Sequence, residues 1–565
     1  MCRATLVFLV FVVASWITSP AQTFTTLYSF CSQDRCNDGL NPYSPVVRGS
    51  DGHFYGTTLL GGTIGDGTVF EMTPEGVLTT LYSFKGYHDG TGTRTGLVVG
   101  ADGNFYGANP FGGEDNWGTV FKIMPGGALT VLHTFNDYYD HDGALPNGLV
   151  QATDGSFYGT AGGGPMFAGI VFKITFDGTL TTLHAFDRTD GQSPLAPPIQ
   201  GSDGNFYGTT SEAGPNGYGT VYKMSPQGSL MTLHSFNHTD GAAPYAQLVQ
   251  ASDGNFYGTT TEGGANGYGT VFKITPQGTL STLHSFNIVD GLFPYGTLVQ
   301  ATDGNFYGTT NQGGGNDTCF QGCGTIFKIT ATGVLTTVHT FDSTDGYNPY
   351  GGLVQAADGS FYGTTTGGGA SGDGTVFRLI VYPVLSVAKL GLGTVTSEDG
   401  HIYCGSACSY WYFDGSQINL SALPAPGYTF AGWTGCDNVN GSYCSMTMAG
   451  AKNVVASFAT ANITLTSLTF KPSYVRGGQV SAGTLTLNAP APSGGVTVAL
   501  SSDHPGVAHP PSFVFVPGGQ TSVGFAVRTF PVKSNTTVMI AATAGNSHVS
   551  GTLTVGTAFL TPSLR

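Results

Sequence analysis

The chain has 565 residues, and only 9% of them are charged, against about 25% in ordinary soluble proteins. Its formal net charge is −15 at pH 7, with no cluster of Lys and Arg. Proteins that bind nucleic acid or anionic membrane surfaces need basic patches, so this composition argues against both kinds of partner.

Residues 1–21 have the pattern of a secretory signal peptide. Arg3 supplies the positive start, residues 6–17 are apolar, and Ala21 ends a run of small residues suited to cleavage. No later segment reaches the roughly 18 apolar residues of a spanning helix. We therefore expect a secreted or cell-surface protein with no membrane span after the signal peptide is removed.

One phrase, Asp-Gly-x-Phe-Tyr-Gly, occurs seven times along the chain. It starts at Asp51, Asp102, Asp154, Asp203, Asp253, Asp303 and Asp358. A β-patterned repeat of about 50 residues is typical of a propeller blade. The unit at 246–287 shows four strand-like runs, at 248–250, 256–260, 270–274 and 280–286, separated by Gly-rich turns.

The two ends of the repeat region complement each other. Residues 23–30 resemble the fourth strand of a unit, although they precede any first strand. The seventh unit ends after residue 380 without a fourth strand. Pairing these ends would remove two exposed strand edges. The sequence therefore predicts an all-β fold with a seven-bladed β-propeller at 22–383, closed by the N-terminal strand.

The sequence pattern changes at Pro383. Residues 384–460 lose the 50-residue period and show short alternating runs, which predict a small β module. Residues 461–557 contain about seven alternating runs, which suit an immunoglobulin-like sandwich without the Cys pair and Trp of antibody domains. Residues 558–565 form a tail.

Apart from Cys2, the cysteines fall into four close pairs: Cys31 and Cys36, Cys319 and Cys323, Cys404 and Cys408, Cys436 and Cys444. In an exported chain this pattern favours four local disulfides. Metal binding is the alternative, but no spacing is Cys-x-x-Cys and no paired His accompanies them. Free thiols are a third possibility.

The repeated units, with their Gly-Gly and Gly-Thr-Val-Phe-Lys-Ile phrases, resemble the GloVer tandem repeat of exported "choice-of-anchor" bacterial proteins over about residues 23–380. Residues 384–460, with Gly-Trp-Thr-Gly-Cys, resemble a divergent internalin-type B-repeat, and the last module is similar to immunoglobulin-like repeats of exported bacterial proteins. These resemblances imply an exported, surface-associated bacterial protein and supply no catalytic residues.

Residues that every unit repeats are best explained by packing. This applies to the Phe-Tyr pairs and to the fourth-strand positions Tyr28, Tyr82, His133, His184, His234, His284 and His339. A further ring of acids occupies Asp-Gly turns: Asp38, Asp89, Asp142, Asp190, Asp240, Asp290 and Asp345. We expect these acids to cap turns and the protein to need no cofactor, with Ca²⁺ as the alternative ligand of that ring.

Aromatic residues that do not repeat are better candidates for binding. The loops between the second and third strands, and between one unit and the next, share one face of a propeller. The sequence places ten such residues on that face: Tyr87, His88, Trp117, Tyr138, Tyr139, Phe167, Tyr218, Tyr268, Phe293 and Tyr347. The candidates for ligand binding among them are Trp117, Tyr138, Tyr139, Tyr218, Tyr268, Phe293 and Tyr347. Exposed aromatics beside polar groups suit the apolar faces of sugar rings.

No serine-hydrolase elbow, zinc-protease helix or phosphate-binding loop occurs in the sequence. The prediction is a monomeric, non-catalytic binding or adhesion protein whose partner is an extracellular glycan or a surface protein. One alternative is a glycan-active hydrolase or lyase built on carboxylates such as Glu114, Asp115, Asp140 or Glu262. The other is a structural surface-layer component.

Overall fold

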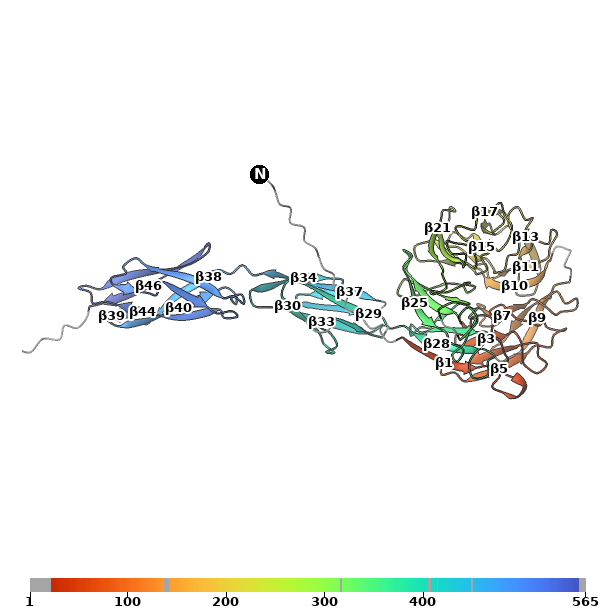
Figure 1. The fold of residues 1–565 in the computed structure, drawn as a ribbon, viewed down its shortest axis with the longest axis horizontal. Helices are drawn as coiled ribbons and strands as arrows, with labels where there is room; N and C mark the ends of the chain where they lie inside the picture. The colour runs from red at the N-terminus through yellow and green to blue at the C-terminus, as the bar shows by residue number, and fades with distance from the viewer. Residues whose placement is uncertain are drawn as a thin grey trace, which may run out of the picture. The chain divides into compact units, whose positions relative to one another are not determined.

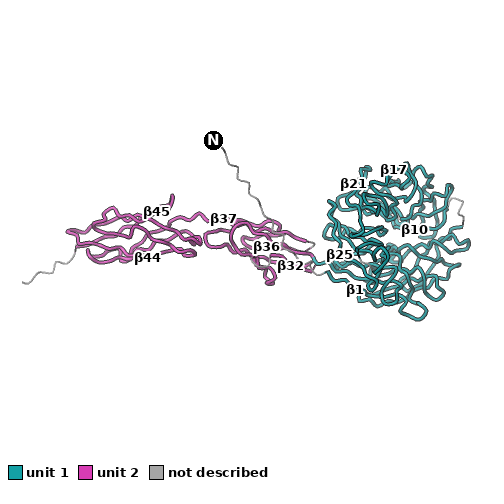
Figure 2. Tube along the Cα trace, in the orientation of Figure 1, with its two compact units in different colours: residues 1–382 teal, residues 383–565 magenta. Residues whose placement is uncertain are grey.

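The computed structural model describes residues 22–136, 142–315, 318–404, 408–413, 415–448 and 451–557. The expected signal peptide, the tail, Tyr138 and Tyr139 lie outside the described residues. The chain divides into two units, Met1–Tyr382 and Pro383–Arg565 (Figure 2). Among the described residues the only helical element is a short 3-10 turn, η1 (Asp34–Cys36). None of the helical structure described is long and apolar enough to cross a membrane.

Unit 1 is a β-propeller-like repeat fold made of four-stranded antiparallel sheets, seven in the described part, which succeed one another around a common centre (Figure 1). Each sheet corresponds to one sequence repeat, and we number the sheets 1 to 7 along the chain. The first strand of each sheet is the innermost. The second strand carries the Phe-Tyr-Gly phrase.

The strands of sheets 1 to 4 have the following bounds. Sheet 1 contains β2 (Val47–Arg48), β3 (Phe54–Thr58), β4 (Thr68–Met72) and β5 (Leu78–Ser83). Sheet 2 contains β6 (Val98–Val99), β7 (Phe105–Asn109), β8 (Thr119–Ile123) and β9 (Leu129–Thr134). Sheet 3 contains β10 (Ala144–Gln151), β11 (Phe157–Gly162), β12 (Ile170–Ile174) and β13 (Leu180–Ala185). Sheet 4 contains β14 (Ile199–Gln200), β15 (Phe206–Thr210), β16 (Thr220–Met224) and β17 (Leu230–Ser235).

Sheets 5 to 7 complete the unit. Sheet 5 contains β18 (Val249–Gln250), β19 (Phe256–Thr260), β20 (Thr270–Ile274) and β21 (Leu280–Ser285). Sheet 6 contains β22 (Val299–Gln300), β23 (Phe306–Thr310), β24 (Thr325–Ile329) and β25 (Leu335–Thr340). Sheet 7 contains β26 (Val354–Gln355), β27 (Phe361–Thr365), β28 (Thr375–Ile380) and, as its outer strand, β1 (Thr23–Ser29).

Aromatic stacking joins each sheet to the next. Successive side chains of a strand point to opposite faces, so the Phe and the Tyr of each repeat face different neighbours. The Tyr of one sheet stacks on the Phe of the next with ring centres 4.0–4.3 Å apart: Tyr55 on Phe105, Tyr106 on Phe157, Tyr158 on Phe206, Tyr207 on Phe256, Tyr257 on Phe306, Tyr307 on Phe361 and Tyr362 on Phe54. All these rings are buried, which confirms their predicted packing role.

The glycine that follows each Tyr makes room for a third aromatic ring. At Gly258 an added Cβ would lie 2.7 Å from the Cζ atom of Phe272, which belongs to the next strand of the same sheet. The repeat therefore needs Gly here because the Phe272 ring occupies the space above its backbone.

The N-terminal strand completes the last sheet. β1 pairs antiparallel with β28 from Thr23 opposite Ile380 to Ser29 opposite Thr375. Phe24 stacks on His339 of sheet 6 at 3.9 Å, and the fully buried Phe30 contacts Phe70 of sheet 1. The first strand of the chain thus contacts the sheets on both sides of sheet 7.

Unit 2 contains two separate hydrophobic cores, each between two sheets. The core of the first module includes Leu385, Trp433 and Phe458, and the core of the second includes Leu485, Val538 and Leu553. In the first module one sheet has the order β32-β29-β37-β34 and the other β31-β30-β33-β36-β35. In the second the orders are β38-β40-β44-β42 and β39-β46-β45-β41-β43.

The strands of the first module are β29 (Val384–Leu390), β30 (Gly393–Ser397), β31 (Tyr403–Cys404), β32 (Ser409–Trp411), β33 (Gln417–Pro424), β34 (Tyr428–Thr434), β35 (Asn438–Asn440), β36 (Tyr443–Thr447) and β37 (Lys452–Thr460). Those of the second are β38 (Leu465–Lys471), β39 (Tyr474–Arg476), β40 (Val480–Leu487), β41 (Val496–Ser502), β42 (Ala508–His509), β43 (Phe513–Val516), β44 (Ser522–Thr529), β45 (Thr536–Ala544) and β46 (Ser547–Gly556).

The cysteines pair as their spacing predicts. The structure contains the disulfides Cys31–Cys36, Cys319–Cys323, Cys404–Cys408 and Cys436–Cys444. Each joins residues four to eight positions apart and therefore pins a local loop. Such bonds persist in oxidising compartments, which agrees with an extracellular-type protein.

Removal of residues 22–30 should destabilise unit 1. The deletion strips β1 from β28, leaves an unpaired edge on sheet 7 and removes the buried ring of Phe30. We expect a lower melting temperature by calorimetry and aggregation by light scattering. Val334→Ala, at a side chain that is 64% exposed, is the control and should melt like the parent. A deletion variant as stable as the parent would contradict the role of β1.

The stacking contacts should carry more stability than the polar contacts at the same residue. Tyr257→Ala removes a buried ring and should cost about 3–5 kcal/mol in urea unfolding. Tyr257→Phe keeps the ring and loses only the hydrogen bond that its hydroxyl donates to Asp253, so it should cost about 1 kcal/mol. Equal losses in the two variants would show that stacking is not the dominant contribution.

Candidate ligand-binding face

Two sets of loops come together on one face of unit 1, which we call the loop face. In six sheets the loop before the first strand forms a backbone bridge with the loop between the second and third strands: Leu40 with Leu60, Thr91 with Phe111, Gln192 with Glu212, Ala242 with Glu262, Leu292 with Gln312 and Tyr347 with Gly367. The loop face is therefore a connected surface rather than a set of separate loops.

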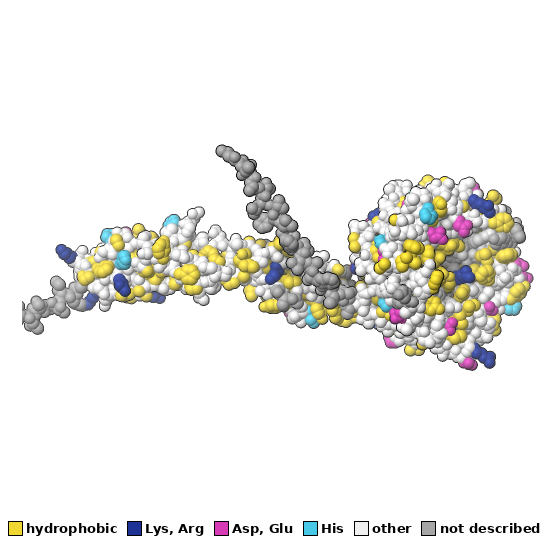
Figure 3. Space-filling view, viewed as in Figure 1, with side chains coloured by type: hydrophobic (Ala, Val, Ile, Leu, Met, Phe, Trp, Pro, Cys, Tyr) yellow, Lys and Arg dark blue, Asp and Glu magenta, His cyan; other side chains and the backbone are white. Residues whose placement is uncertain are grey.

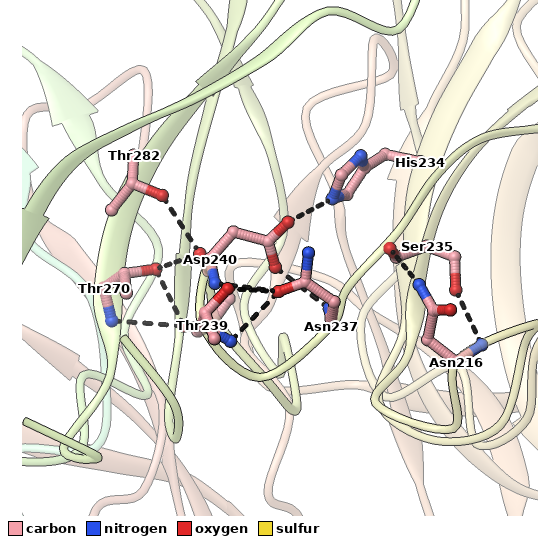
Figure 4. A network of polar contacts seen from close by, with 9 residues as sticks. Asn216, His234, Ser235, Asn237, Thr239, Asp240, Thr270 and Thr282 are labelled. Atoms are coloured by element: carbon pink, nitrogen blue, oxygen red, sulfur yellow. Dashed lines mark hydrogen bonds and ion pairs between the residues drawn. The ribbon is translucent and has the colours of Figure 1, made fainter. Parts of the chain in front are cut away.

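The repeated His and Asp residues pair with each other beneath this face. His234 Nε2 lies 3.0 Å from Asp240 Oδ2, and Asp240 Oδ1 accepts a hydrogen bond from the backbone N–H of Asn237 (Figure 4). The same pairing joins His184 to Asp190, His284 to Asp290 and His339 to Asp345 at 2.7–2.9 Å, while Tyr28 donates to Asp38 at 2.7 Å. Asp38, Asp190, Asp240, Asp290 and Asp345 thus accept hydrogen bonds from their own loops or pair with the ring on the fourth strand, whereas Asp142 Oδ1 has no hydrogen-bond partner among the described residues.

The structure brings only some of the predicted loop aromatics together. Tyr268 and Phe293 meet edge to face with ring centres 6.3 Å apart, and Tyr218 contacts His238 at 5.2 Å. Trp117 packs against the core between sheets 2 and 3, and Tyr347 against the core between sheets 6 and 7. Of the loop candidates, Tyr218 is one of the more exposed, at 41%.

A second aromatic group lies nearer the centre of unit 1 and was missed by the sequence analysis. Each sheet contributes one residue from just before, or within, its first strand to a ring of seven positions. We call these positions the axial ring: Tyr43, Arg94, Asn147, Leu195, Tyr245, Tyr295 and Tyr350. Four of these are Tyr preceded by Pro. The recurring Pro-Tyr pair is the sequence signal that marks these positions.

The tyrosines of the axial ring contact one another across sheets. Tyr43 stacks on Tyr350 at 4.2 Å, Tyr350 lies 4.9 Å from Tyr295, and Tyr295 meets Tyr245 edge to face at 5.3 Å. The guanidinium carbon of Arg94 lies 5.9 Å from the centre of the Tyr43 ring, within range of a cation–π interaction. Sheets 5, 6, 7, 1 and 2 thus contribute one continuous band.

The axial ring combines apolar faces with polar groups. Burial, followed by the neighbouring Tyr350, raises the pKa of Tyr295 to about 12. Burial also raises the pKa of Tyr245, with smaller contributions from the carboxylates of Glu212 and Glu262. Tyr245 is 37% exposed and Arg94 is exposed, so the band is accessible. Figure 3 shows hydrophobic side chains gathered near the middle of one face of unit 1.

The carboxylates considered for catalysis do not form one site. Glu114 and Asp115 are exposed on sheet 2, whereas Glu262 is exposed on sheet 5, and these sheets are not neighbours. Asp140 lies outside the described residues. A glycosidase needs two carboxyl groups facing one bond, within about 10 Å of each other. Glu262 on sheet 5 is therefore not a partner for Glu114 or Asp115 on sheet 2.

A family model described as the Gloeobacter/Verrucomicrobia repeat matches residues 13–198 and 195–389, which together cover unit 1. The chain belongs to this family. The match confirms the resemblance to the GloVer repeat. A model described as the divergent InlB B-repeat domain matches residues 385–462, the first module of unit 2. This repeat family and the disulfides indicate an extracellular-type β-repeat protein.

None of the curated proteins matches this member of the Gloeobacter/Verrucomicrobia repeat family. Among solved structures, an extracellular domain from B. thetaiotaomicron, assigned to a one-component system, is 10% identical with a TM-score of 0.40 and aligns with 95% of this chain. The chain spans only 59% of that domain. A polysaccharide lyase, the PL25 ulvan lyase, is 8% identical with a TM-score of 0.37, covering 73% of this chain and 95% of its own. Scores this low support no functional assignment.

The raised pKa of Tyr295 predicts how the stability of the folded protein changes at alkaline pH. Its pKa in the folded protein, about 12, lies above the ordinary value of about 10. The stability that it contributes is complete below pH 10 and is lost as the pH rises towards 12. Between pH 9 and 11 the urea midpoint of the parent should therefore fall more than that of Tyr295→Phe. Parallel declines would contradict the burial of this hydroxyl.

Proposed function

We propose that the chain is an exported or cell-surface binding protein in which unit 1 is a seven-bladed β-propeller, closed by β1, that binds a glycan without catalysis. In this proposal the propeller occupies residues 22–383 and the B-repeat-like module residues 384–460. Residues 461–557 form an immunoglobulin-like sandwich, supported by two packed sheets of four and five strands around their own core. Residues 1–21 act as the signal peptide, and adhesion is the biological role.

The axial ring is the observation that carries this proposal. The fold does not need an aromatic residue at its seven positions, because Asn147 and Leu195 occupy two of them. Four tyrosines nevertheless gather there on consecutive sheets and contact one another. An accessible cluster of contacting aromatics that blade packing does not require is best explained by a ligand.

A glycan suits the chemistry of this band. The CH faces of a sugar ring can stack on the tyrosine faces, while its hydroxyl groups find acceptors at Glu212 and Glu262 and donors at Arg94. The loop aromatics Tyr218, Tyr268 and Phe293 would extend the same surface outward from the centre. Trp117, Tyr138, Tyr139 and Tyr347 complete the residues that we propose for binding.

Two other functions receive less support. A glycan-active enzyme would require a pair of facing carboxylates, and Glu262 lies on a sheet that does not neighbour the sheet of Glu114 and Asp115. A structural surface-layer component would not require an accessible aromatic band. A surface protein remains a possible partner of the same face, since aromatic residues and Arg are also enriched at protein interfaces.

Glycan-array screening of the mature chain, followed by calorimetry with the best ligand, tests the proposal. Tyr295→Ala and Tyr350→Ala should each weaken binding by about 1–3 kcal/mol, by analogy with the stacking of bases on aromatic side chains. Tyr218→Ala measures the contribution of the outer loops. We expect it to have a smaller effect, because its ring contacts only His238 among the aromatic contacts of this face.

Asn147→Ala is the matched control, because it changes the same ring at a position without an aromatic side chain. It should bind like the parent. Melting temperatures separate lost binding from lost folding. Binding that survives both tyrosine substitutions, or that is found only in residues 384–557, would show that the axial ring is not the site. If no glycan on the array binds and the chain captures a surface protein instead, the ligand is a protein and the proposed glycan is wrong.

A further inference from the structure

Sheet 1 departs from the other six sheets at a repeated ion pair. The Asp that begins the Asp-Gly-x-Phe-Tyr-Gly phrase, which we call the turn Asp, lies between the first and second strands. In sheets 2 to 7 it contacts a Lys or Arg on the third strand at 2.6–2.8 Å: Asp102 with Lys122, Asp154 with Lys173, Asp203 with Lys223, Asp253 with Lys273, Asp303 with Lys328 and Asp358 with Arg378. In sheet 1 the position of the cation is taken by Glu71. A positive charge has been replaced there by a negative one.

Sheet 1 differs from the other sheets at a second position, beside the first. The position two residues after the turn Asp is Asn or Ser in sheets 2 to 7, but in sheet 1 it is His53. His53 Nδ1 contacts Glu71 Oε1 and lies 4.0 Å from Asp51 Oδ2. One ligand atom from each of Asp51, His53 and Glu71 falls within 4.8 Å of the others.

The surrounding residues do not neutralise this cluster with a fixed cation. Within the described part of the chain, neither Asp51 nor Glu71 forms an ion pair with Lys or Arg, although Arg48 lies beside Gly52 of the same turn. Glu75 adds further negative charge near His53. Two carboxylates have thus been brought together where every other sheet places one carboxylate and one cation.

We propose that Asp51, His53 and Glu71 form a binding site for a divalent transition-metal ion such as Zn²⁺. One imidazole nitrogen and two carboxylate oxygens are ligands that Zn²⁺ accepts, and the ion would restore the positive charge that sheet 1 has lost. A tetrahedral ion with bonds of about 2.0–2.1 Å separates its ligand atoms by about 3.4 Å. Small side-chain rotations would reach that spacing, because all three groups are partly exposed.

The outer contacts of the site hold its carboxylate in place. The Tyr55 hydroxyl donates to Asp51 Oδ2 at 2.6 Å, and the backbone N–H of His53 donates to Asp51 Oδ1 at 3.0 Å. Second-layer hydrogen bonds of this kind orient metal ligands. Tyr55 and Glu71 are also opposite each other in the register of β3 and β4, so the fold itself sets their separation. The site combines the turn between the first and second strands, which holds Asp51 and His53, with Glu71 near the end of the third strand.

Titration calorimetry with ZnCl₂ on the metal-stripped mature chain, residues 22–565 without a polyhistidine tag, tests this proposal. The parent should show a site that Glu71→Lys and His53→Asn each weaken at least tenfold. Both substitutions restore what other sheets carry, so both variants should fold and melt like the parent or at higher temperature. A parent that gives no saturable binding, or variants that bind as the parent does, would overturn the site.

A transplanted site provides the converse test. Asn205→His combined with Lys223→Glu recreates the arrangement in sheet 4, and this double variant should bind one more Zn²⁺ than the parent. Lys223→Glu alone is its control and should gain no comparable site, because it lacks the imidazole. Ca²⁺ binding that is indifferent to His53→Asn would instead indicate an oxygen-only site and would overturn the assignment to a transition metal.

Discussion

The stacking of each repeat's Tyr on the Phe of the next sheet is the contact on which unit 1 depends. An aromatic pair contributes about 0.5–1.5 kcal/mol beyond the burial of its surface. Seven such pairs in a closed circle hold every sheet from both sides. Six of these Tyr side chains, all but Tyr362, also donate a hydrogen bond to the Asp of their own phrase. The Asp-Gly-x-Phe-Tyr-Gly phrase thus sets the turn, the strand and the interface between sheets together.

Some positions of the repeat build the fold, whereas others vary from sheet to sheet. The stacked rings and the following Gly recur in every sheet, and the acid of the loop before the first strand faces a His in five cases and a Tyr in two, Tyr28 and Tyr82. The axial ring and the cation of the turn ion pair can change without loss of the stacking contacts. The two sites that we propose use positions that vary between sheets, as Tyr295 differs from Leu195 and Glu71 from Lys223.

The sequence predicted most of the fold because seven copies of one unit show which positions stay the same and which vary. The four strands per unit followed from the alternation of residue types, the placement of β1 from the likeness of residues 23–30 to a fourth strand, and the four local disulfides from the close spacing of the cysteines. The site was harder to predict. Tyr43 and Tyr350 are about 300 residues apart in the chain, and their stacking exists only after the ring has closed. His234 and Asp240 are six residues apart, but a turn brings them together, which periodicity alone does not reveal.

The place of β1 in the last sheet has a consequence for the order of folding. The strand that emerges first during synthesis finds its partner, β28, only after about 350 further residues have been made. The earlier sheets can form locally as they appear, since hairpins within one repeat join near neighbours in sequence. The circle itself is completed by a single contact of very high sequence separation, which is the slowest kind to form. The ring of unit 1 therefore stays open until its last repeat, with β28, has been made.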